Sequence, residues 1–180
     1  MTLIYYINYF VKIMNQKNSL GLNICFKDED NPIILFKEWF EEAKKSEIND
    51  ANAFTLGTVD KNGYPSSRIV LLKDFDNDGF IFYTNLNSPK SGDLKKNSKA
   101  AMCFHWKSLQ RQVQISGKIT KVSDIEADNY FSSRPYESKI GAWASDQSRI
   151  MKKREEFLKK IEDYKKKYNN EKELQRPKHW

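Results

Sequence analysis

The stretch that decides the fold runs from residue 53 to residue 85 and reads AFTLGTVDKNGYPSSRIVLLKDFDNDGFIFYTN. Apolar, β-branched and aromatic residues dominate three segments of it, which predicts strands over residues 53–59, 66–73 and 80–85. Short polar segments separate these strands, and the first contains Asn62-Gly63, a pair favoured in tight hairpin turns. Three consecutive strands joined by tight turns predict an antiparallel meander.

Two more strands are expected after the meander, over residues 100–106 and 110–122. Because few helices separate the strands, an antiparallel barrel is favoured over a parallel sheet. The predicted fold class is therefore mainly β with flanking helices (α+β).

Helix starts are marked by capping residues. Asn31-Pro32 opens one helix, with Asn suited to the N-cap and Pro to the first helical position. Ser88-Pro89 opens a short helix in the same way, and we expect it to end near Lys96.

Two further helices are expected toward the carboxyl end. Ser123 begins an S-x-x-E capping box, and its helix must stop near Arg134 because Pro135 follows. Apolar residues then recur at helical spacing over residues 148–168, which predicts a long amphipathic helix.

Composition excludes several classes of protein. The chain has 180 residues, of which 39% are hydrophobic and 13% aromatic, enough to bury a core. Two Cys and two His form no disulfide framework and no metal-ligand spacing, so a metal site is not expected and the reducing cytoplasm is the expected compartment. The glycines match neither the Rossmann fingerprint nor the P-loop. A phosphate would need Arg, Lys, Ser, Thr or a helix N-terminus instead.

Residues 1–30 are expected to form a leader, either packed or disordered. Both Met1 and Met14 remain candidates for the start of translation. The apolar run at its beginning lacks the flanks of a signal peptide and is too short to span a membrane. We expect a barrel domain with helices over residues 31–148, and an amphipathic helix with the chain's end over residues 149–180.

Basic residues concentrate in residues 152–180, where nucleic acid could bind. Acid-before-base pairs four residues apart, such as Glu155–Lys159 and Asp163–Lys167, are typical of a solvated helix face. We therefore expect neither a nucleic-acid partner nor a membrane, although a basic RNA-binding barrel is one alternative.

The second strand carries two cations, Arg68 and Lys73, around an apolar run. Strand alternation places them on opposite faces, so they cannot bind one small anion without a bulge or a second site. Alternatively, both only mark the ends of a buried strand. Other cations, hydroxyls and amides could join them, without a general base or nucleophile, which suits a bound cofactor that carries the chemistry. These residues are Tyr83, Thr84, Lys90, Arg111, Gln112, Tyr130, Arg134 and Ser138.

Ordered motifs contain these residues: RIVLLK, FYTN, RQV, NYFSSRP and IGAW. From about Asn31 to Trp180 the chain resembles the pyridoxine (pyridoxamine) 5′-phosphate oxidase family. The resemblance implies an FMN-binding split β-barrel, assembled as a homodimer with FMN between subunits. It also implies oxidation of pyridoxamine or pyridoxine 5′-phosphate at C4′ to pyridoxal 5′-phosphate, with dioxygen as the final acceptor.

The resemblance also assigns roles to residues, and it puts Arg68 on the FMN phosphate. The implied FMN contacts are Arg68, Ile69, Val70, Leu71, Leu72, Lys73, Tyr83, Thr84, Lys90, Gln112, Gln147 and Ser148. The implied substrate-phosphate contacts are Lys73, Tyr130, Arg134 and Ser138. Two cations on opposite faces would then serve two anions.

Some positions depart from the family pattern. Pro89 stands where the family often has Arg, and the chain ends at Trp180, where the pattern continues with a flavin-contacting Trp and an Arg-x-His motif. This departure keeps a second function open, that of a non-catalytic or degenerate split-barrel protein that binds flavin or a B6 phosphate.

Overall fold

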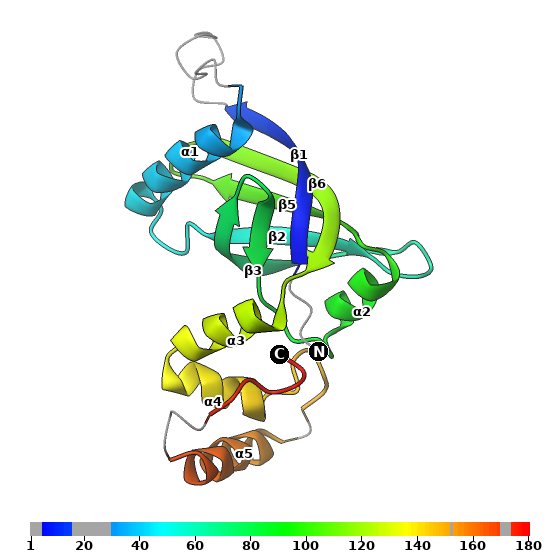
Figure 1. Cartoon of the computed structure of the whole chain (residues 1–180), viewed down its shortest axis with the longest axis vertical. Coiled ribbons are helices and arrows are strands. Elements are labelled where there is room, and N and C mark those ends of the chain that lie inside the picture. Colours follow the sequence, from blue (N-terminus) through cyan, green and yellow to red (C-terminus); the bar gives the residue numbers. More distant parts are fainter. Residues whose placement is uncertain (1–4, 16–29, 152, 170–173) are drawn as a thin grey trace. The chain divides into compact units, whose positions relative to one another are not determined.

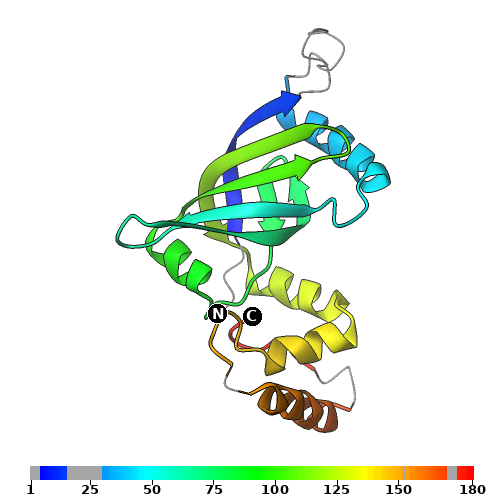
Figure 2. The ribbon, with the colours of Figure 1, turned by 180° about the vertical axis from the view of Figure 1, so that it is seen from behind.

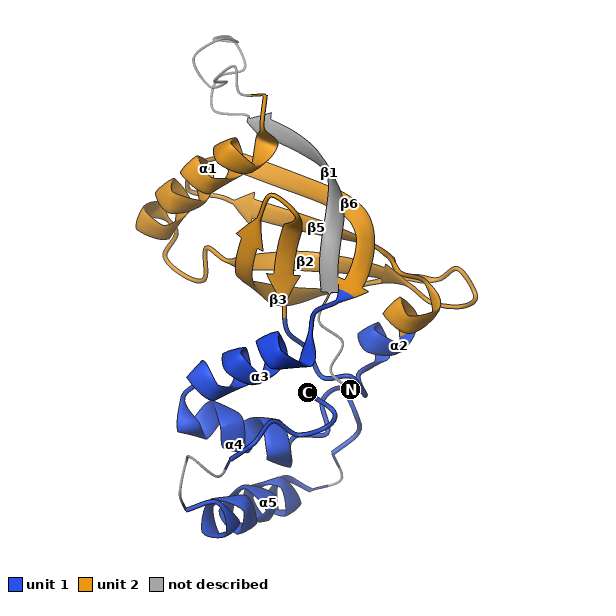
Figure 3. Cartoon of the chain, viewed as in Figure 1, with its two compact units in different colours: residues 1–4, 83–92, 121–180 blue, residues 5–82, 93–120 orange. Residues whose placement is uncertain are grey.

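The computed structural model describes residues 5–15, 30–151, 153–169 and 174–180. The chain divides into two compact units, coloured separately in Figure 3. Unit 1 contains Tyr83–Gly92 and Lys121–Trp180, and unit 2 contains Tyr5–Phe82 and Asp93–Thr120. The domain boundaries expected at residues 30 and 148 stay a prediction.

Unit 2 is built on an antiparallel barrel, as predicted (Figure 1). Its strands follow the order β1-β4-β3-β2-β5-β6 around the barrel, and β2, β3 and β4 form the expected meander. The strands are β1 (Tyr5–Asn15), β2 (Ala53–Val59), β3 (Pro65–Asp76), β4 (Gly79–Phe82), β5 (Lys99–Trp106) and β6 (Arg111–Lys121). Strand β1 lies within the stretch expected to be a leader and was not predicted as a strand. Residues 1–4 and 16–29 of that leader lie outside the described residues.

A tight turn sets the register between β2 and β3. Val59 pairs with Pro65, and the Asp60 carboxylate accepts the backbone N–H groups of Asn62 and Tyr64 at 2.8 and 2.9 Å. Gly63 has φ 88°, in the left-handed region that glycine adopts without strain. The turn predicted at Asn62-Gly63 is therefore confirmed, and it also places Ser66 opposite Thr58.

The core of unit 2 is aromatic and lies between the barrel and α1 (Pro32–Ser46). Helix α1 begins as predicted, because the Asn31 side chain accepts the backbone N–H of Ile33 at 2.9 Å. The fully buried Phe36 ring meets Phe80 and Phe104 at 4.9 and 5.3 Å between centroids. Both views show α1 lying against the barrel strands (Figures 1 and 2).

Helix α2 (Pro89–Lys96) occupies the predicted short segment and spans the division between the two units. It begins at Ser88, whose carbonyl accepts the backbone N–H groups of Ser91 and Gly92, both at 3.1 Å. The Ser88 hydroxyl also donates to the carbonyl of Asn85 at 2.7 Å, so the turn before the helix is tied down. This geometry fixes the position of the first helical turn.

Unit 1 contains α3 (Asp124–Ser133), α4 (Tyr136–Ala144) and α5 (Arg154–Lys167). The Ser123 hydroxyl accepts the backbone N–H of Glu126 at 3.2 Å, and the helix that follows stops before Pro135 as predicted. Helix α4 was not predicted, since no capping side chain marks its start.

The predicted start of the last helix was wrong, because α5 begins at Arg154 rather than near Ser148. Ser148 has a left-handed φ of 61°, and the Ile150 side chain is 96% exposed, so the apolar stripe does not extend that far. The helix packs on α4 through Trp143, whose ring contacts those of Tyr164 and Tyr168. Among the described residues, no helix combines the length and hydrophobicity that crossing a membrane requires.

Candidate functional site

Three aromatic rings of unit 1 lie nearly parallel to one another in one cluster. Tyr83, just after β4, lies 3.6 Å from Tyr130 of α3 between centroids, at an interplanar angle of 8°. The Trp180 ring is 5.8 Å from both tyrosine rings and nearly parallel to them. A residue predicted to contact FMN and one predicted to contact substrate are therefore in direct contact.

Arg134 lies at the C-cap of α3, where Pro135 ends the helix. Its guanidinium carbon sits 4.5 Å above the centre of the Trp180 ring, a cation–π contact. Its Nη1 atom is buried and has no hydrogen-bond partner among the described residues. Burial lowers the pKa of Arg134, while the neighbouring Tyr130 opposes the shift. A partly buried guanidinium whose buried nitrogen has no hydrogen-bond partner is suited to bind an anion.

Ser138 is the third predicted substrate residue in unit 1. It is half-buried and lies in the first turn of α4, where its backbone N–H donates to the carbonyl of Pro135 at 2.9 Å. Arg134 and Ser138 thus flank the same proline, at the junction between α3 and α4.

Lys90 contacts several of the residues that were predicted to bind the cofactor. The residue is 7% exposed, and its amine donates to Thr84 Oγ1 at 2.9 Å, Ser88 Oγ at 3.2 Å and Gln147 Oε1 at 3.3 Å. It stands in the first turn of α2, where free backbone N–H groups favour negative charge. The structure therefore brings Thr84, Lys90 and Gln147 together, with the exposed Ser148 next along the chain.

Arg68 is held by hydroxyl groups of the β2–β3 hairpin in unit 2. Its Nη1 donates to Thr58 Oγ1 at 2.7 Å, and its Nη2 donates to Ser66 Oγ at 2.5 Å. The Thr58 hydroxyl in turn donates to the Asp93 carboxylate at 2.8 Å. Burial lowers the pKa of Arg68, and the charge of Asp93 opposes that shift. The guanidinium is therefore fixed before any ligand binds.

Lys73 lies at an irregularity of β3, which interrupts the regular alternation that was expected to place it on the opposite face from Arg68. Arg68 pairs with the buried Leu56 and Leu72 pairs with the buried Phe82, whereas Lys73 is exposed and follows Leu72 directly. The register of β3 against β4 shifts at Lys73, between Leu72 and Asp74. A bulge re-aims the side chain it carries, so Lys73 stands apart from the regular ladder.

The remaining strand residues with predicted cofactor contacts differ in exposure. Ile69 is 66% exposed, Val70 and Leu71 are half-buried, and Leu72 is buried with its backbone bonded to Asn52. Half-buried Gln112 lies on β6, opposite His105 of β5.

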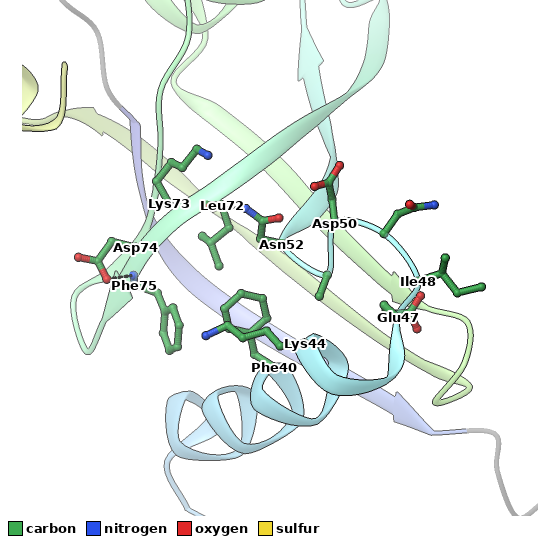
Figure 4. Close-up of a pocket in the computed structure, with 12 residues that line it drawn as sticks. Phe40, Lys44, Glu47, Ile48, Asp50, Asn52, Leu72, Lys73, Asp74 and Phe75 are labelled. Atoms are coloured by element: carbon green, nitrogen blue, oxygen red, sulfur yellow. Dashed lines mark hydrogen bonds between the residues drawn. The ribbon is translucent and has the colours of Figure 1, made fainter. Parts of the chain in front are cut away.

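Lys73 also lines a pocket of about 740 Å³ between β3 and the end of α1 (Figure 4). Leu72 and Phe75 point toward Phe40 there, whereas Lys73 points away from it. The other charged side chains of the lining are Lys44, Glu47, Asp50 and Asp74. Because both signs of charge line this pocket, its electrostatics do not favour an anion.

The predicted site residues divide between the two units. Unit 1 holds Tyr83, Thr84, Lys90, Tyr130, Arg134, Ser138, Gln147 and Ser148, and unit 2 holds Arg68 to Lys73 and Gln112. Sequence reasoning missed Thr58, Ser66, Asp93 and Trp180. Counting back from Asn62-Gly63 would have placed Thr58 opposite Ser66, but no local signal connects Trp180 with Arg134.

The fold is that of the split-barrel proteins that bind flavin. Residues 40–168 match the family model described as pyridoxamine 5′-phosphate oxidase, and the chain belongs to this family.

Two curated relatives support the assignment, both named pyridoxine/pyridoxamine 5′-phosphate oxidase. The protein from Pelagibacter ubique (strain HTCC1062) is 62% identical over 167 residues, covering 93% of this chain and 80% of the relative. The protein from Allorhizobium ampelinum is 52% identical over 155 residues, covering 86% of this chain and 75% of the relative.

Solved structures give the same architecture. PhzG from Burkholderia lata 383, solved in complex with tetrahydrophenazine-1-carboxylic acid, has a TM-score of 0.78 and 25% identity, covering 85% of this chain and 74% of its own. A pyridoxamine 5′-phosphate oxidase-related, FMN-binding protein from Nostoc punctiforme has a TM-score of 0.58 and 17% identity over 71% of each chain. The Nostoc likeness concerns the fold alone.

Proposed function

We propose that the protein catalyses the FMN-dependent oxidation of pyridoxamine or pyridoxine 5′-phosphate to pyridoxal 5′-phosphate. The observation that carries the proposal is the half-buried Arg134, whose buried Nη1 has no hydrogen-bond partner among the described residues and whose guanidinium lies over Trp180, near the stacked pair Tyr83 and Tyr130. Family membership supports the same reaction class.

The side chains present fit a flavin phosphate. Arg68 in unit 2 and Lys90 in unit 1 are each held in place by neutral oxygens, so each is an oriented cation suited to a phosphate oxygen. Thr84, Gln112, Gln147 and Ser148 add hydroxyl and amide groups, and residues 69–72 add backbone and apolar surface. FMN, when bound, supplies the two-electron acceptor for the C4′ position of the substrate, with dioxygen as the final acceptor.

The chain's own residues bind and orient the substrate. Arg134 offers N–H groups to the substrate phosphate, Tyr130 and Ser138 offer hydroxyls, and Lys73 adds a second cation. The set has no general base or nucleophile, and none is required when the cofactor carries the redox chemistry. The protein therefore contributes by binding the phosphate ester and holding C4′ in a reactive position.

We also propose that the protein acts in the cytoplasm as a homodimer. A dimer would cover the face of β3 that carries Ile69, whose side chain is 66% exposed. Measuring the mass in solution, with and without FMN, tests this assembly.

Two measurements on the purified chain test the function. FMN reconstitution followed by spectroscopy should give a bound, yellow protein, and a colourless protein would contradict the cofactor. Addition of pyridoxamine 5′-phosphate to the FMN-loaded protein should release hydrogen peroxide and pyridoxal 5′-phosphate in equal amounts. Bound FMN without turnover would favour a non-catalytic binding protein instead.

A further inference from the structure

Residues 174–180 are anchored on α3 and α4 of unit 1. Arg176, whose side chain is 9% exposed, donates through Nε to Asp128 at 2.5 Å and through Nη2 to Asp124 at 3.3 Å. Trp143 of α4 donates through its indole N–H to the Gln175 carbonyl at 2.9 Å. Side chains of two helices thus determine the path of this segment.

The end of the segment is anchored as well. Arg176 Nη1 donates to the Trp180 carbonyl at 2.8 Å, and the backbone N–H of Leu86 donates to the His179 carbonyl at 2.7 Å. The His179 ring lies 2.9 Å from the Ala142 carbonyl. The carbonyl groups of Trp180 and of the residue before it are therefore both hydrogen-bonded, and Trp180 is 8% exposed.

The Trp180 ring contacts two predicted substrate residues at once. It lies beside the Tyr130 ring, nearly parallel to it, and carries the Arg134 guanidinium on its face. A cation–π contact favours the positive charge but uses no N–H donor, so the contact with Trp180 itself leaves the donors in the guanidinium plane available. The unsatisfied, buried Nη1 of Arg134 is consistent with this arrangement. An oxyanion that approaches in the plane of the guanidinium would accept the hydrogen bond that Nη1 lacks.

We propose that Trp180 is a positioning residue that orients Arg134 and Tyr130 toward the phosphate of the substrate. It makes the site selective for a phosphate ester over the free alcohol. This inference rests on the proposed function, because the phosphate is that of the B6 substrate.

Equilibrium binding of two probes, pyridoxal 5′-phosphate and pyridoxal, tests the inference on FMN-loaded protein. In Trp180→Ala, we expect affinity for the phosphate ester to fall about 3- to 10-fold, while affinity for pyridoxal stays unchanged. Trp180→Phe keeps a flat ring of weaker cation–π strength and should lie between wild type and Trp180→Ala. If Trp180→Ala does not fold, Trp180→Phe tests the inference through the same quantity, the ratio of the affinity for pyridoxal 5′-phosphate to the affinity for pyridoxal.

Trp39→Phe is the matched control. The Arg111 guanidinium carbon lies over Trp39 at the same 4.5 Å, but this pair belongs to unit 2 and not to the phosphate site. Its ratio of affinities should equal that of wild type.

The outcomes separate the inference from the proposed function. Equal weakening of both probes in the Trp180 variants would indicate a merely structural role and would overturn the inference, as would an unchanged ratio. Wild-type protein that binds pyridoxal 5′-phosphate no tighter than pyridoxal would overturn the phosphate site itself.

Discussion

The ring of Tyr83 lies flat against the ring of Tyr130, with 3.6 Å between centroids and 8° between planes. Tyr83 follows the last strand of the meander, and Tyr130 is on α3, so packing brings together positions 47 residues apart in the chain (130 − 83). Because Tyr83 is predicted to contact FMN and Tyr130 the substrate, this contact would connect the two predicted ligand sites.

Two substitutions at Tyr130 separate its hydroxyl from its ring. Tyr130→Phe keeps the stack on Tyr83, so FMN affinity should be unchanged while the KM for pyridoxamine 5′-phosphate rises about tenfold, the size of one hydrogen bond to a charged group. Tyr130→Leu removes the stack as well and should also weaken FMN binding by a few-fold. FMN titration and steady-state kinetics measure both effects. FMN binding lost equally in both variants would contradict the separation.

Arg68 and Arg134 should serve different phosphates. Arg68→Ala is expected to weaken FMN binding by at least tenfold, since it removes an oriented cation. Arg134→Ala should retain FMN and raise the substrate concentration needed for half-maximal rate. Fluorescence titration of FMN and peroxide assays with saturating FMN measure these effects. If both variants lost FMN to the same extent, the assignment of the two cations would be wrong.

Phe36 should dominate the stability of unit 2. Its ring is fully buried among aromatic partners from α1 and the barrel, so Phe36→Ala should cost about 3–5 kcal/mol. The midpoint of thermal unfolding should fall by roughly 10 °C. Ile34→Ala, on the same helix at a side chain that is 46% exposed, is the control and should cost below about 1 kcal/mol. Equal losses would show that Phe36 does not pack as described.

The ion pairs of Asp124 should make stability depend on pH. The hydrogen bond from Lys121 lowers the pKa of Asp124 below its ordinary 3.8, and Arg176 lowers it further. Because the folded pKa is depressed, the stabilisation is present above pH 3.8 and disappears as pH falls through the lower folded value. Asp124→Asn should therefore unfold at a slightly lower temperature than wild type at pH 7 and at the same temperature near pH 2. Thermal scans across pH measure this, and a difference that persists in strong acid would speak against it.

Local physics explains which elements the sequence predicted well. Strand β2 has the predicted bounds, Ala53–Val59, because a two-residue alternation and a tight turn act within a few residues. The helix starts at Asn31 and Ser123 were found because a capping side chain bonds to the turn that follows it. Helix α4 lacks such a cap and was missed.

The candidate site shows the same contrast. Lys90 and Thr84 are six residues apart, and their contact crosses one short loop. Arg68 meets Thr58 through a hairpin whose register follows from its turn. By contrast, the segment that carries Trp180 could not be placed, because nothing near it in the chain specifies its partners.

The amino acid order alone determined the antiparallel meander, the capped helices and the set of cations and hydroxyls, since each depends on neighbours along the chain. Only the tertiary structure decided that the rings of Tyr83, Tyr130 and Trp180 form one parallel cluster and that Arg134 lies over the Trp180 ring. Contacts between distant residues depend on how complete helices and segments pack, and that packing minimises the free energy of a whole unit rather than of any local stretch.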